Sequence, residues 1–420
     1  MSLRFFCPSG TGTRYEYSTA LWVSGMKRGL FFLCVFFLAG CGLIAPERGE
    51  VPPLVPVSHR DRPPLADDLD RASLELAVGR SMEYYNRLPE AREVRFGDRV
   101  CTVGELKESL RDFLGILRTS DSDKEMAQKI KERFDLYRST GRKGGKVLFT
   151  GYYEPMLTGS FERTDEYRYP IYRTPDDHIA IDLGKFREKY KGERIVARME
   201  DGRVVPYYTR EDIDIKRSLE GKGLELLWLS DPVDIFFLQI QGSGVVKLPD
   251  GSLVQVSYEQ SNGHPYSSIG RILVDQGKMS MEEISLKAIK RYLREHPDEM
   301  FDILSHNESY VFFRIVEEGP VGGLDVPVTS GRTIATDPKV FPRGVLAFIR
   351  LKKPVIDGGG AIVSWEPFSR FVLNQDAGGA IKGPGRVDLF CGRGRDAEIM
   401  AGHLKEEGEL YFLVKKRQPS

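Results

Sequence analysis

The chain has 420 residues, 41% hydrophobic and 29% charged, which is the composition of an ordinary globular protein long enough for two domains. Its 61 Lys and Arg balance 61 Asp and Glu, so the formal net charge is zero. This balance gives no electrostatic argument for a nucleic acid or an anionic membrane surface as partner. The 24 prolines and 43 glycines favour loops and short strands over a helical bundle.

The N-terminal segment has the features of an export signal. A basic MKR at 26–28 precedes the apolar run GLFFLCVFFLAGC, which is too short for a comfortable membrane span and ends at Cys41. The sequence LAGC resembles a bacterial lipobox, whose cysteine is lipidated; a plain signal peptide with an incidental cysteine is the alternative. Gly42 replaces the aspartate that retains lipoproteins in the inner membrane, which favours the outer membrane. We interpret residues 1–25 as an extension ahead of the native start and 26–41 as a lipoprotein signal.

Residues 42–65 are rich in proline and lack apolar periodicity, which predicts a tether between the lipid anchor and the folded part. Apolar residues at helical spacing then predict three helices, at 69–85, 106–117 and 130–136. The third follows the run SDSD at 120–123, which offers good N-cap residues.

Short strands and turns dominate from residue 146 onward. KVLFTGYYEPMLTGS (146–160) predicts a strand that runs into a corner, and 160–260 is mostly β with a charged helical segment at 209–221. Residues 279–304 predict helix, and strands return after Tyr310. The strand lengths and turn spacing favour compact barrels over a parallel sheet, and the lack of a fixed repeat argues against a solenoid.

Two cysteines, Cys101 and Cys391, lie in the part of the chain predicted to fold, because Cys7, Cys34 and Cys41 belong to the N-terminal segment. An export route permits a disulfide between the two, and a pair of buried free thiols is the alternative. The sequence contains no CxxC pair, and its six histidines show no paired helical spacing, so we expect no metal site.

Three segments combine polar and aromatic residues in ways that fit a ligand, although each also has a structural interpretation. FFLQIQGSG (236–244) predicts a strand with Gln239 and Gln241 on one face, either as an amide surface for hydroxyl and N-acetyl groups or as an ordinary polar face. NGHPYSSIGRIL (262–273) places polar side chains on a loop before a helix. TGYYEP (150–155) sets two tyrosines beside a carboxylate. Asp337-Pro338 fits turn chemistry better than catalysis.

Two further aspartates, Asp376 and Asp388, flank a glycine-rich stretch in QDAGGAIKGPGRVDLFCG. In this order and behind a lipobox, GYYEP, FFLQIQGSG, NGHPYSSIG, SGRTIATDP and QDAGGAIKGPGRVDLFCG resemble the membrane-bound lytic murein transglycosylase A family, from about residue 66 to the end. The last segment also resembles the 3D domain, which is named for three aspartates, here Asp337, Asp376 and Asp388.

The resemblance implies a mainly β fold with flanking helices. A double-psi β-barrel catalytic domain would be built from both chain ends (66–156 and 308–420, with the 3D domain at about 325–415), and a second, β-rich substrate-binding domain (157–307) would be inserted into it.

The resemblance also implies an enzyme that cleaves the β-1,4 bond between N-acetylmuramic acid and N-acetylglucosamine in peptidoglycan strands, and leaves 1,6-anhydromuramic ends during cell-wall turnover. The family's catalytic aspartate falls at Asp388. One carboxyl can act first as acid toward the leaving oxygen and then as base toward the C6 hydroxyl. Its neighbours Val387, Leu389 and Phe390 would raise its pKa by desolvation. Asp376 and Asp337 would support it, and the role of Arg386 stays open because members vary just before the catalytic aspartate.

Substrate contacts are expected from the polar and glycine residues of the same motifs: Tyr152, Tyr153, Glu154, Gln239, Gln241, Ser243, Asn262, His264, Tyr266, Arg332, Gly378, Gly379 and Lys382. We expect no cofactor and no nucleic acid, and the resemblance names no protein partner for cell-wall synthesis or hydrolysis. The expected location is the periplasmic face of the outer membrane of a Gram-negative bacterium, with Cys41 as the lipid attachment site. Two alternatives are a non-catalytic peptidoglycan-binding lipoprotein and a water-dependent muramidase, which would leave a reducing end.

Overall fold

The computed structural model of the chain describes residues 52–417, and these residues form one compact unit. The predictions for the extension at 1–25, for the signal ending at Cys41 and for the first part of the tether lie outside the described residues. Among the helices of 52–417, none combines the length and the apolar character that a membrane crossing requires.

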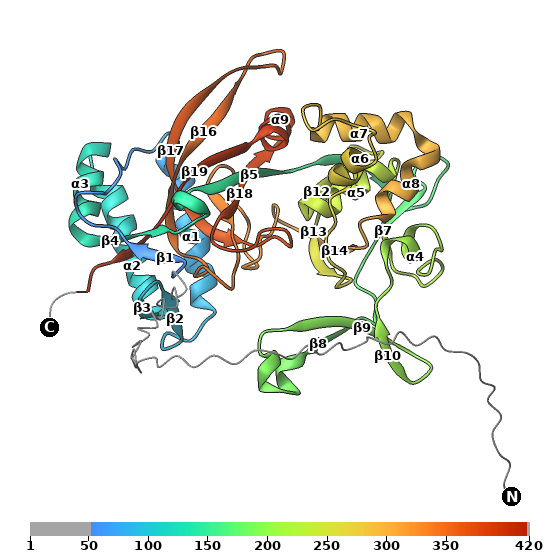
Figure 1. The fold of residues 1–420 in the computed structure, drawn as a ribbon, viewed down its shortest axis with the longest axis horizontal. Helices are drawn as coiled ribbons and strands as arrows, with labels where there is room; N and C mark the ends of the chain where they lie inside the picture. Colours follow the sequence, from blue (N-terminus) through green and yellow to red (C-terminus); the bar gives the residue numbers. More distant parts are fainter. Residues whose placement is uncertain (1–51, 418–420) are drawn as a thin grey trace, which may run out of the picture. The chain divides into compact units, whose positions relative to one another are not determined.

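Six strands close into a β-barrel. They are β5 (Val147–Glu154), β15 (Thr333–Ala335), β16 (Leu346–Ile356), β17 (Ile362–Asp376), β18 (Arg386–Arg393) and β19 (Lys405–Lys415). Hydrogen-bonded neighbours run in the order β5-β19-β16-β17-β15-β18 and return to β5. The pairs β15–β17 and β18–β5 are parallel, and the other pairs are antiparallel. In Figure 1 the teal β5 lies among the orange and red strands from the C-terminal part, which confirms a barrel built from both chain ends.

Helices and short strands from the N-terminal part flank this barrel: β1 (Leu54–Pro56), α1 (Arg71–Asn86), β2 (Glu93–Phe96), β3 (Arg99–Thr102), α2 (Val103–Thr119), α3 (Asp123–Arg133) and β4 (Phe134–Ser139), with α9 (Arg395–His403) near the C-terminus. The side chain of Asp70 caps α1 by accepting the Ser73 amide, and Thr102 and Glu105 form a capping box at the start of α2. The apolar faces of both helices pack into the barrel core, so the two predicted helices form close to their expected bounds.

A second β region is inserted between β5 and β15. Its six-stranded sheet has the order β14-β13-β12-β6-β11-β7, and three further strands pair as β10-β9-β8. The strands are β6 (Met156–Ser160), β7 (Tyr169–Tyr172), β8 (Ile179–Asp182), β9 (Arg194–Glu200), β10 (Arg203–Pro206), β11 (Glu225–Leu229), β12 (Ser243–Lys247), β13 (Leu253–Ser261) and β14 (Val311–Val316). The helices are α4 (Arg210–Asp214), α5 (Pro232–Gln241), α6 (Ile269–Asp275), α7 (Leu286–Glu295) and α8 (Pro297–Ser305). The strand β14 follows the expected end of the insert at residue 307 and still pairs with the insert strand β13.

The two regions bury separate cores. One large cluster joins the barrel strands to the N-terminal helices, whereas three clusters built from residues of the insert lie around its six-stranded sheet and helices. A small fifth cluster of Tyr152, Val328, Ala335 and Phe390 lies beside the aspartates discussed below. Separate cores are what a barrel domain and an inserted domain require.

The prediction of a strand at FFLQIQGSG is wrong, because residues 232–241 form the helix α5. Asp231 caps its first turn, Pro232 occupies the first helical position, and Gly242 ends it in the left-handed region with φ of 80°. These end signals outweigh the β-prone apolar run. Gln239 and Gln241 are two residues apart on a helix, so they do not share one face as predicted.

The bounds expected for four other segments are also wrong. The third predicted helix ends at Arg133, and Phe134 and Leu136 lie on β4, whose register is fixed by pairing with β19. The predicted tether is too long, because β1 pairs with β4 and Leu54 is buried. The helical stretches expected at 209–221 and 279–304 are shorter and broken, with α4 in the first and α7 and α8 in the second. Cys101 and Cys391 are both free thiols, so the disulfide alternative is not formed.

Candidate functional site

A groove of 750 Å³ is lined by residues of both the barrel and the insert. The barrel contributes residues of β5, β15, β17, β18 and the loop at 377–385, and the insert contributes residues of α5 and of the segment 261–266. Of the residues predicted from sequence, the groove is lined by Tyr152, Gln239, Gln241, Ser243, His264, Tyr266, Asp376, Gly378, Gly379, Lys382 and Asp388. The fold therefore brings most of the predicted site together.

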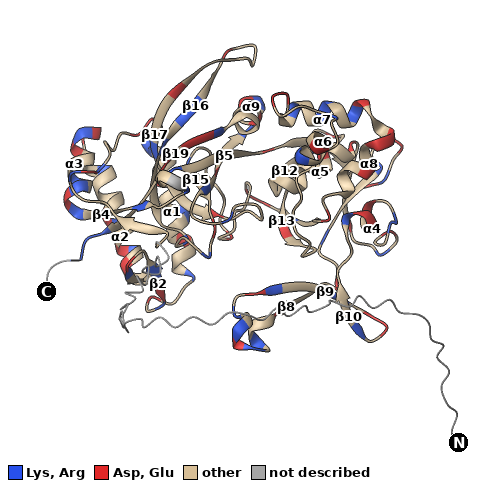
Figure 2. Cartoon of the chain, in the orientation of Figure 1, with Lys and Arg blue, Asp and Glu red and all other residues tan. Residues whose placement is uncertain are grey.

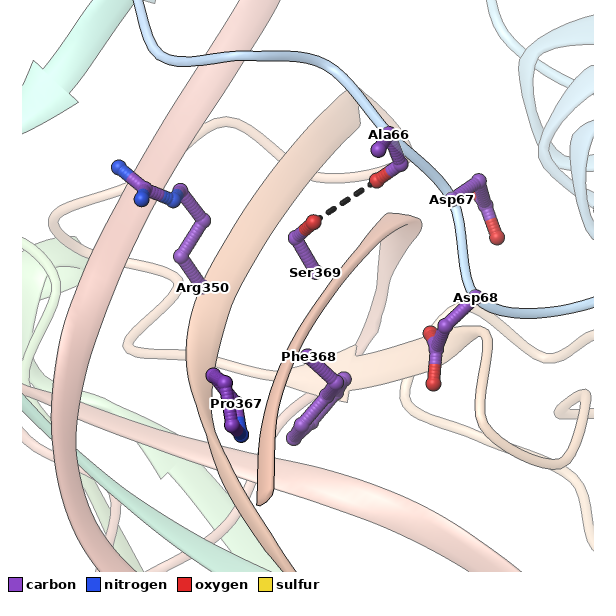
Figure 3. Close-up of a pocket in the computed structure, with 7 residues that line it drawn as sticks. All are labelled: Ala66, Asp67, Asp68, Arg350, Pro367, Phe368 and Ser369. Atoms are coloured by element: carbon purple, nitrogen blue, oxygen red, sulfur yellow. Dashed lines mark hydrogen bonds between the residues drawn. The ribbon is translucent and has the colours of Figure 1, made fainter.

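A smaller cavity of 270 Å³ lies between residues 66–68 and the strands β16 and β17 (Figure 3). The Ser369 hydroxyl donates a hydrogen bond to the Ala66 carbonyl there, at 2.9 Å. Asp68 is neutralised by Arg370 and Lys353. Because its charged groups are already paired and no predicted site residue lines it, this cavity offers no comparable chemistry. Figure 2 shows charges of both signs spread over the helices and loops, in keeping with the zero net charge.

The two aspartates of the groove lie in one row of the barrel sheet. Ala335 on β15 is paired with Asp388 on β18 and, across a register shift, with Asp376 on β17. On the far side of Asp388 its register partner is Thr150 on β5. Directly paired residues point to the same side of a sheet, and strands lie about 4.8 Å apart, so the two aspartate backbones are about 10 Å apart across the groove floor.

Asp388 has the environment of a protonated acid. Its side chain is half-buried, and burial raises its pKa to about 6. The Thr150 hydroxyl donates a hydrogen bond to Asp388 Oδ1 at 2.8 Å, which acts in the opposite direction, as does the charge of Arg386. The proximity of Asp376 adds a smaller upward effect on the pKa. A carboxyl in this range can donate a proton near neutral pH and accept it again.

Asp376 is held in place by three hydrogen bonds. Tyr152 Oη donates to its Oδ2 at 2.6 Å, and the amides of Gly323 and Ala377 donate to its Oδ1, each at 2.8 Å. Burial raises its pKa, while these donors act to lower it. The Tyr152 ring packs against Phe390, with ring centres 5.1 Å apart. Asp376 is therefore fixed in orientation, whereas Asp388 has one hydrogen-bond partner among the described residues.

The third aspartate, Asp337, lies beneath the glycine-rich loop. Its Oδ2 accepts the Gly383 amide at 2.8 Å and its Oδ1 accepts the Lys339 amide at 3.0 Å, so it ties the loop to the turn after β15. A Cβ at Gly378 would lie 2.8 Å from the Ile381 side chain, which explains the glycine at this position. Gly379 has open space around it and faces the groove.

The insert side of the groove carries polar and aromatic side chains. Gln239 accepts a hydrogen bond from Arg210 through Oε1, and its Nε2 is buried without a hydrogen-bond partner in the described residues. Gln241 accepts the Tyr153 amide at 2.9 Å. His264 contacts the Tyr207 carbonyl through Nε2 at 2.8 Å, and Tyr266 is 42% exposed. These groups suit a ligand with many hydroxyl and carbonyl oxygens.

Comparisons with known proteins agree with this architecture. The family model described as "MltA specific insert domain" matches residues 148–314, and the model described as "3D domain" matches residues 332–414. The chain is 30% identical over 285 residues to the membrane-bound lytic murein transglycosylase A of Vibrio cholerae, covering 67% of this chain and 68% of that protein. The chain belongs to the membrane-bound lytic murein transglycosylase A family.

Other relatives give the same result. The transglycosylase A of Escherichia coli K12 is 30% identical over 272 residues, which cover 64% of this chain and 66% of that protein. The crystal structure of a membrane-bound lytic murein transglycosylase from Agrobacterium tumefaciens superposes with a TM-score of 0.71 at 30% identity, covering 86% of this chain and 97% of that one. The E. coli enzyme with bound chitohexaose superposes with a TM-score of 0.67 at 25% identity, covering 87% and 96%.

Five residues predicted for the site of this family member lie outside the groove: Asp337, Tyr153, Glu154, Asn262 and Arg332. Arg332 is fully buried and bound to Asp67, and Glu154 is buried in an ion pair with Arg393. Asn262 is buried and bonded to backbone groups of Tyr208, Glu308 and Tyr310. Tyr153 donates to Glu398 at 2.9 Å. The polar atoms of Tyr153, Glu154, Asn262 and Arg332 thus have protein partners outside the groove.

The predicted site does not include the groove residues Thr150, Arg210, Tyr258 and Arg314, whereas Arg386, whose role the sequence leaves open, does line the groove. Thr150 precedes Tyr152 by two positions on a strand, so strand periodicity alone could have added it. Arg210 and Arg314 come from segments with no motif, and no sequence signal identifies them. Within residues 52–417, no group of three or more His, Cys, Asp or Glu is arranged to hold a metal ion.

Proposed function

We propose that this protein is a lytic transglycosylase that cleaves the β-1,4 bond between N-acetylmuramic acid and N-acetylglucosamine in murein, with Asp388 as its acid and base. One observation carries this proposal. Among the described residues that line the groove, the carboxyls are Asp376 and Asp388, and only Asp388 combines a pKa raised to about 6 with a free approach from the groove.

The reaction proceeds in two steps on one carboxyl. Protonated Asp388 donates its proton to the glycosidic oxygen, and the bond from that oxygen to muramic C1 breaks. The resulting Asp388 carboxylate then takes the proton of the muramic C6 hydroxyl, and O6 forms the new bond to C1. Asp388 ends protonated and no water is consumed, so one group serves both steps and no second reactive carboxyl is required.

The other groove residues bind and orient the strand. The buried Nε2 of Gln239 offers a donor to a sugar oxygen, Gly379 lets the loop backbone approach a ring closely, and Tyr266 offers an exposed aromatic face. Asp376, fixed by Tyr152, adds negative charge near the positive charge that develops at C1, which is stabilising in a partly desolvated site.

Two other functions make different products. A water-dependent muramidase uses a second carboxyl as nucleophile or as base for water, and the engagement of Asp376 with three donors argues against that role. A peptidoglycan-binding lipoprotein needs no acid with a raised pKa. Mass spectrometry of sacculi digested by the wild-type protein separates the three. We expect muropeptides one water lighter than muramidase products; muropeptides of full mass, or no release at all, would reject the proposal.

We further propose that the barrel domain is built from 66–156 and 308–420 and the insert from 157–307, except that β14 (Val311–Val316), which pairs with β13, belongs to the sheet of the insert. The separate cores and the family-model matches at 148–314 and 332–414 support this division.

We also propose that lipid on Cys41 anchors the protein at the periplasmic face of the outer membrane. The LAGC sequence and the relatives' name, which calls them membrane-bound, support this location. Cys41→Ser should abolish labelling by radioactive palmitate and move the protein to the soluble periplasmic fraction. Unchanged membrane attachment of this variant would count against the anchor.

A further inference from the structure

The groove contains two cations that the described residues leave unpaired. Its lining includes Arg210, Arg314, Lys382 and Arg386. Arg210 is paired with Asp214 at 3.4 Å and Arg314 with Asp325 at 2.5 Å. Lys382 and Arg386 have no ion pair and no side-chain hydrogen bond within residues 52–417. Both lie in the segment that leads from the glycine-rich loop into Asp388.

Arg386 lies on the same face of β18 as Asp388. The two residues are two positions apart on the strand, so their side chains point to the same side, about 7 Å apart along the chain. Its Nε is buried without a hydrogen-bond partner, although the residue lines the groove. A buried, charged donor without an acceptor is costly, and an acceptor on a bound ligand would remove this cost.

The charge of Arg386 also works against the chemistry assigned to Asp388. Burial raises the pKa of Asp388, whereas the positive charge of Arg386 lowers it and so favours the form that cannot donate a proton. An anion bound to Arg386 would neutralise this charge. The arginine is therefore better explained by a negatively charged group of the substrate than by a direct role in proton transfer.

The substrate carries such a group next to the bond that is cut. Muramic acid differs from N-acetylglucosamine by a lactyl arm on O3, which ends in a carboxylate or continues as a peptide that bears carboxylates. We propose that Arg386, assisted by Lys382, binds a carboxylate on the lactyl arm of the muramic residue whose glycosidic bond faces Asp388. This inference rests on the proposed function. It makes Arg386 a specificity-determining residue, because a guanidinium binds a carboxylate through two parallel hydrogen bonds.

The test measures binding in an Asp388→Asn background, so that strands are not cut. Three ligands of equal length are compared: chitohexaose, a peptide-free muramyl glycan and a peptide-bearing one. We expect Arg386→Gln to weaken binding of the acidic strands about tenfold, equivalent to about 1.4 kcal/mol, and to leave chitohexaose unchanged. A loss confined to the peptide-free strand assigns the lactyl carboxylate, and a loss confined to the peptide-bearing strand assigns the peptide.

Two control variants sharpen this test. Arg386→Lys keeps the charge and should recover part of the affinity. Arg350→Gln removes a guanidinium that lies outside the groove and is paired with Glu409, and should change the preference for acidic strands less than about twofold. An equal loss on chitohexaose, or no loss on either acidic strand, overturns the inference.

Failure of this inference is distinguishable from failure of the proposed function. If wild-type protein releases anhydromuropeptides while Arg386→Gln binds all three ligands normally, the reaction stands and the carboxylate site does not. If Arg386→Gln loses the acidic strands selectively but the wild-type protein releases no anhydro product, the carboxylate site stands and the catalytic proposal fails.

Discussion

The two sides of the groove are built differently. On the barrel side, Thr150, Asp388 and Asp376 lie in one row of a closed sheet. The Tyr152 hydroxyl fixes the Asp376 carboxylate by donating a hydrogen bond to it. On the insert side, the groove residues come from the end of α5, from the loop at 262–266 and from strands that include β13 and β14, and Tyr258 and Tyr266 are 44% and 42% exposed. The aspartates are held by pairing within one closed barrel, whereas the insert side gathers side chains from a helix end, a loop and the strands of a separate sheet.

This difference separates chemistry from recognition. A general acid must hold its position relative to the scissile bond, and a closed barrel supplies that rigidity through paired strands. Recognition of a long glycan needs several contacts that each add little, and loops and helix ends supply these. Substitutions on the barrel side should therefore change the rate of the chemical step, and those on the insert side should change affinity.

The largest effect is expected for Asp388→Asn. The amide keeps the size of the side chain but cannot donate the proton, so activity should fall roughly 100- to 10,000-fold, the contribution of general acid–base catalysis. Murein binding should persist. Release of anhydromuropeptides, measured by mass spectrometry, gives the rate. Release at near the wild-type rate would contradict this assignment and would point to Asp376 as the catalytic carboxyl. The matched control is Asp325→Asn, which changes an exposed aspartate outside the groove.

The pH profile tests the same residue without a substitution. Asp388 must be protonated to begin the reaction, and burial raises its pKa to about 6. The acid form predominates below that pH and is lost above it, so kcat/KM should be level at pH 5 and fall about tenfold per pH unit above about 6. Thr150, Arg386 and Asp376 act on the pKa of Asp388, and the charge of Asp388 in turn reaches Tyr152 and the Cys391 thiol. Arg386→Gln removes a positive charge and should move this descending limb to higher pH. A rate that rises through pH 6 would contradict the assignment.

A smaller effect is expected for Tyr152→Phe. The change removes the hydroxyl that donates to Asp376 and keeps the ring against Phe390, so the fold should persist. Loss of a hydrogen bond to a charged group typically costs about 1.5–3 kcal/mol, and we expect about a tenfold loss of kcat with KM little changed. Tyr153→Phe is the matched control, because that hydroxyl bonds Glu398 outside the groove. Equal losses of kcat in the two variants would contradict the role of the Tyr152 hydroxyl in orienting Asp376.

The sequence predicts the two groove aspartates better than it predicts the surroundings of the other polar motif residues, for a physical reason. Asp376 and Asp388 stand in one motif, and the strands that carry them both pair with β15, so the fold brings them into one row. Arg332 and Glu154 look equally functional in their motifs, but their partners Asp67 and Arg393 are 265 and 239 positions away, and no local pattern reveals that pairing. Buried ion pairs between distant segments are set by the fold.

The helix α5 illustrates the same limit within a single segment. Its apolar run FFLQI fits a buried strand, and only the end signals, Asp231-Pro232 and Gly242, mark a helix. The wrong prediction of a strand gave the wrong orientation for the two glutamine side chains. It still named the right residues, since Gln239 and Gln241 both line the groove. Local composition thus identified residues that line the groove, and tertiary packing decided how they are presented.

The smallest effect is expected on the insert side, for Tyr266→Ala. An exposed aromatic face that stacks on a sugar ring contributes about 0.5–1.5 kcal/mol, so we expect affinity for glycan strands to fall about three- to tenfold with the product and kcat unchanged. Phe186→Ala is the control, because Phe186 is 73% exposed and lies outside the groove. Strand binding by isothermal calorimetry and turnover by product release give the two quantities separately. A loss of kcat without a loss of affinity would show that the insert side also affects the chemical step. It would contradict the view that the barrel side carries the chemistry and the insert side the recognition.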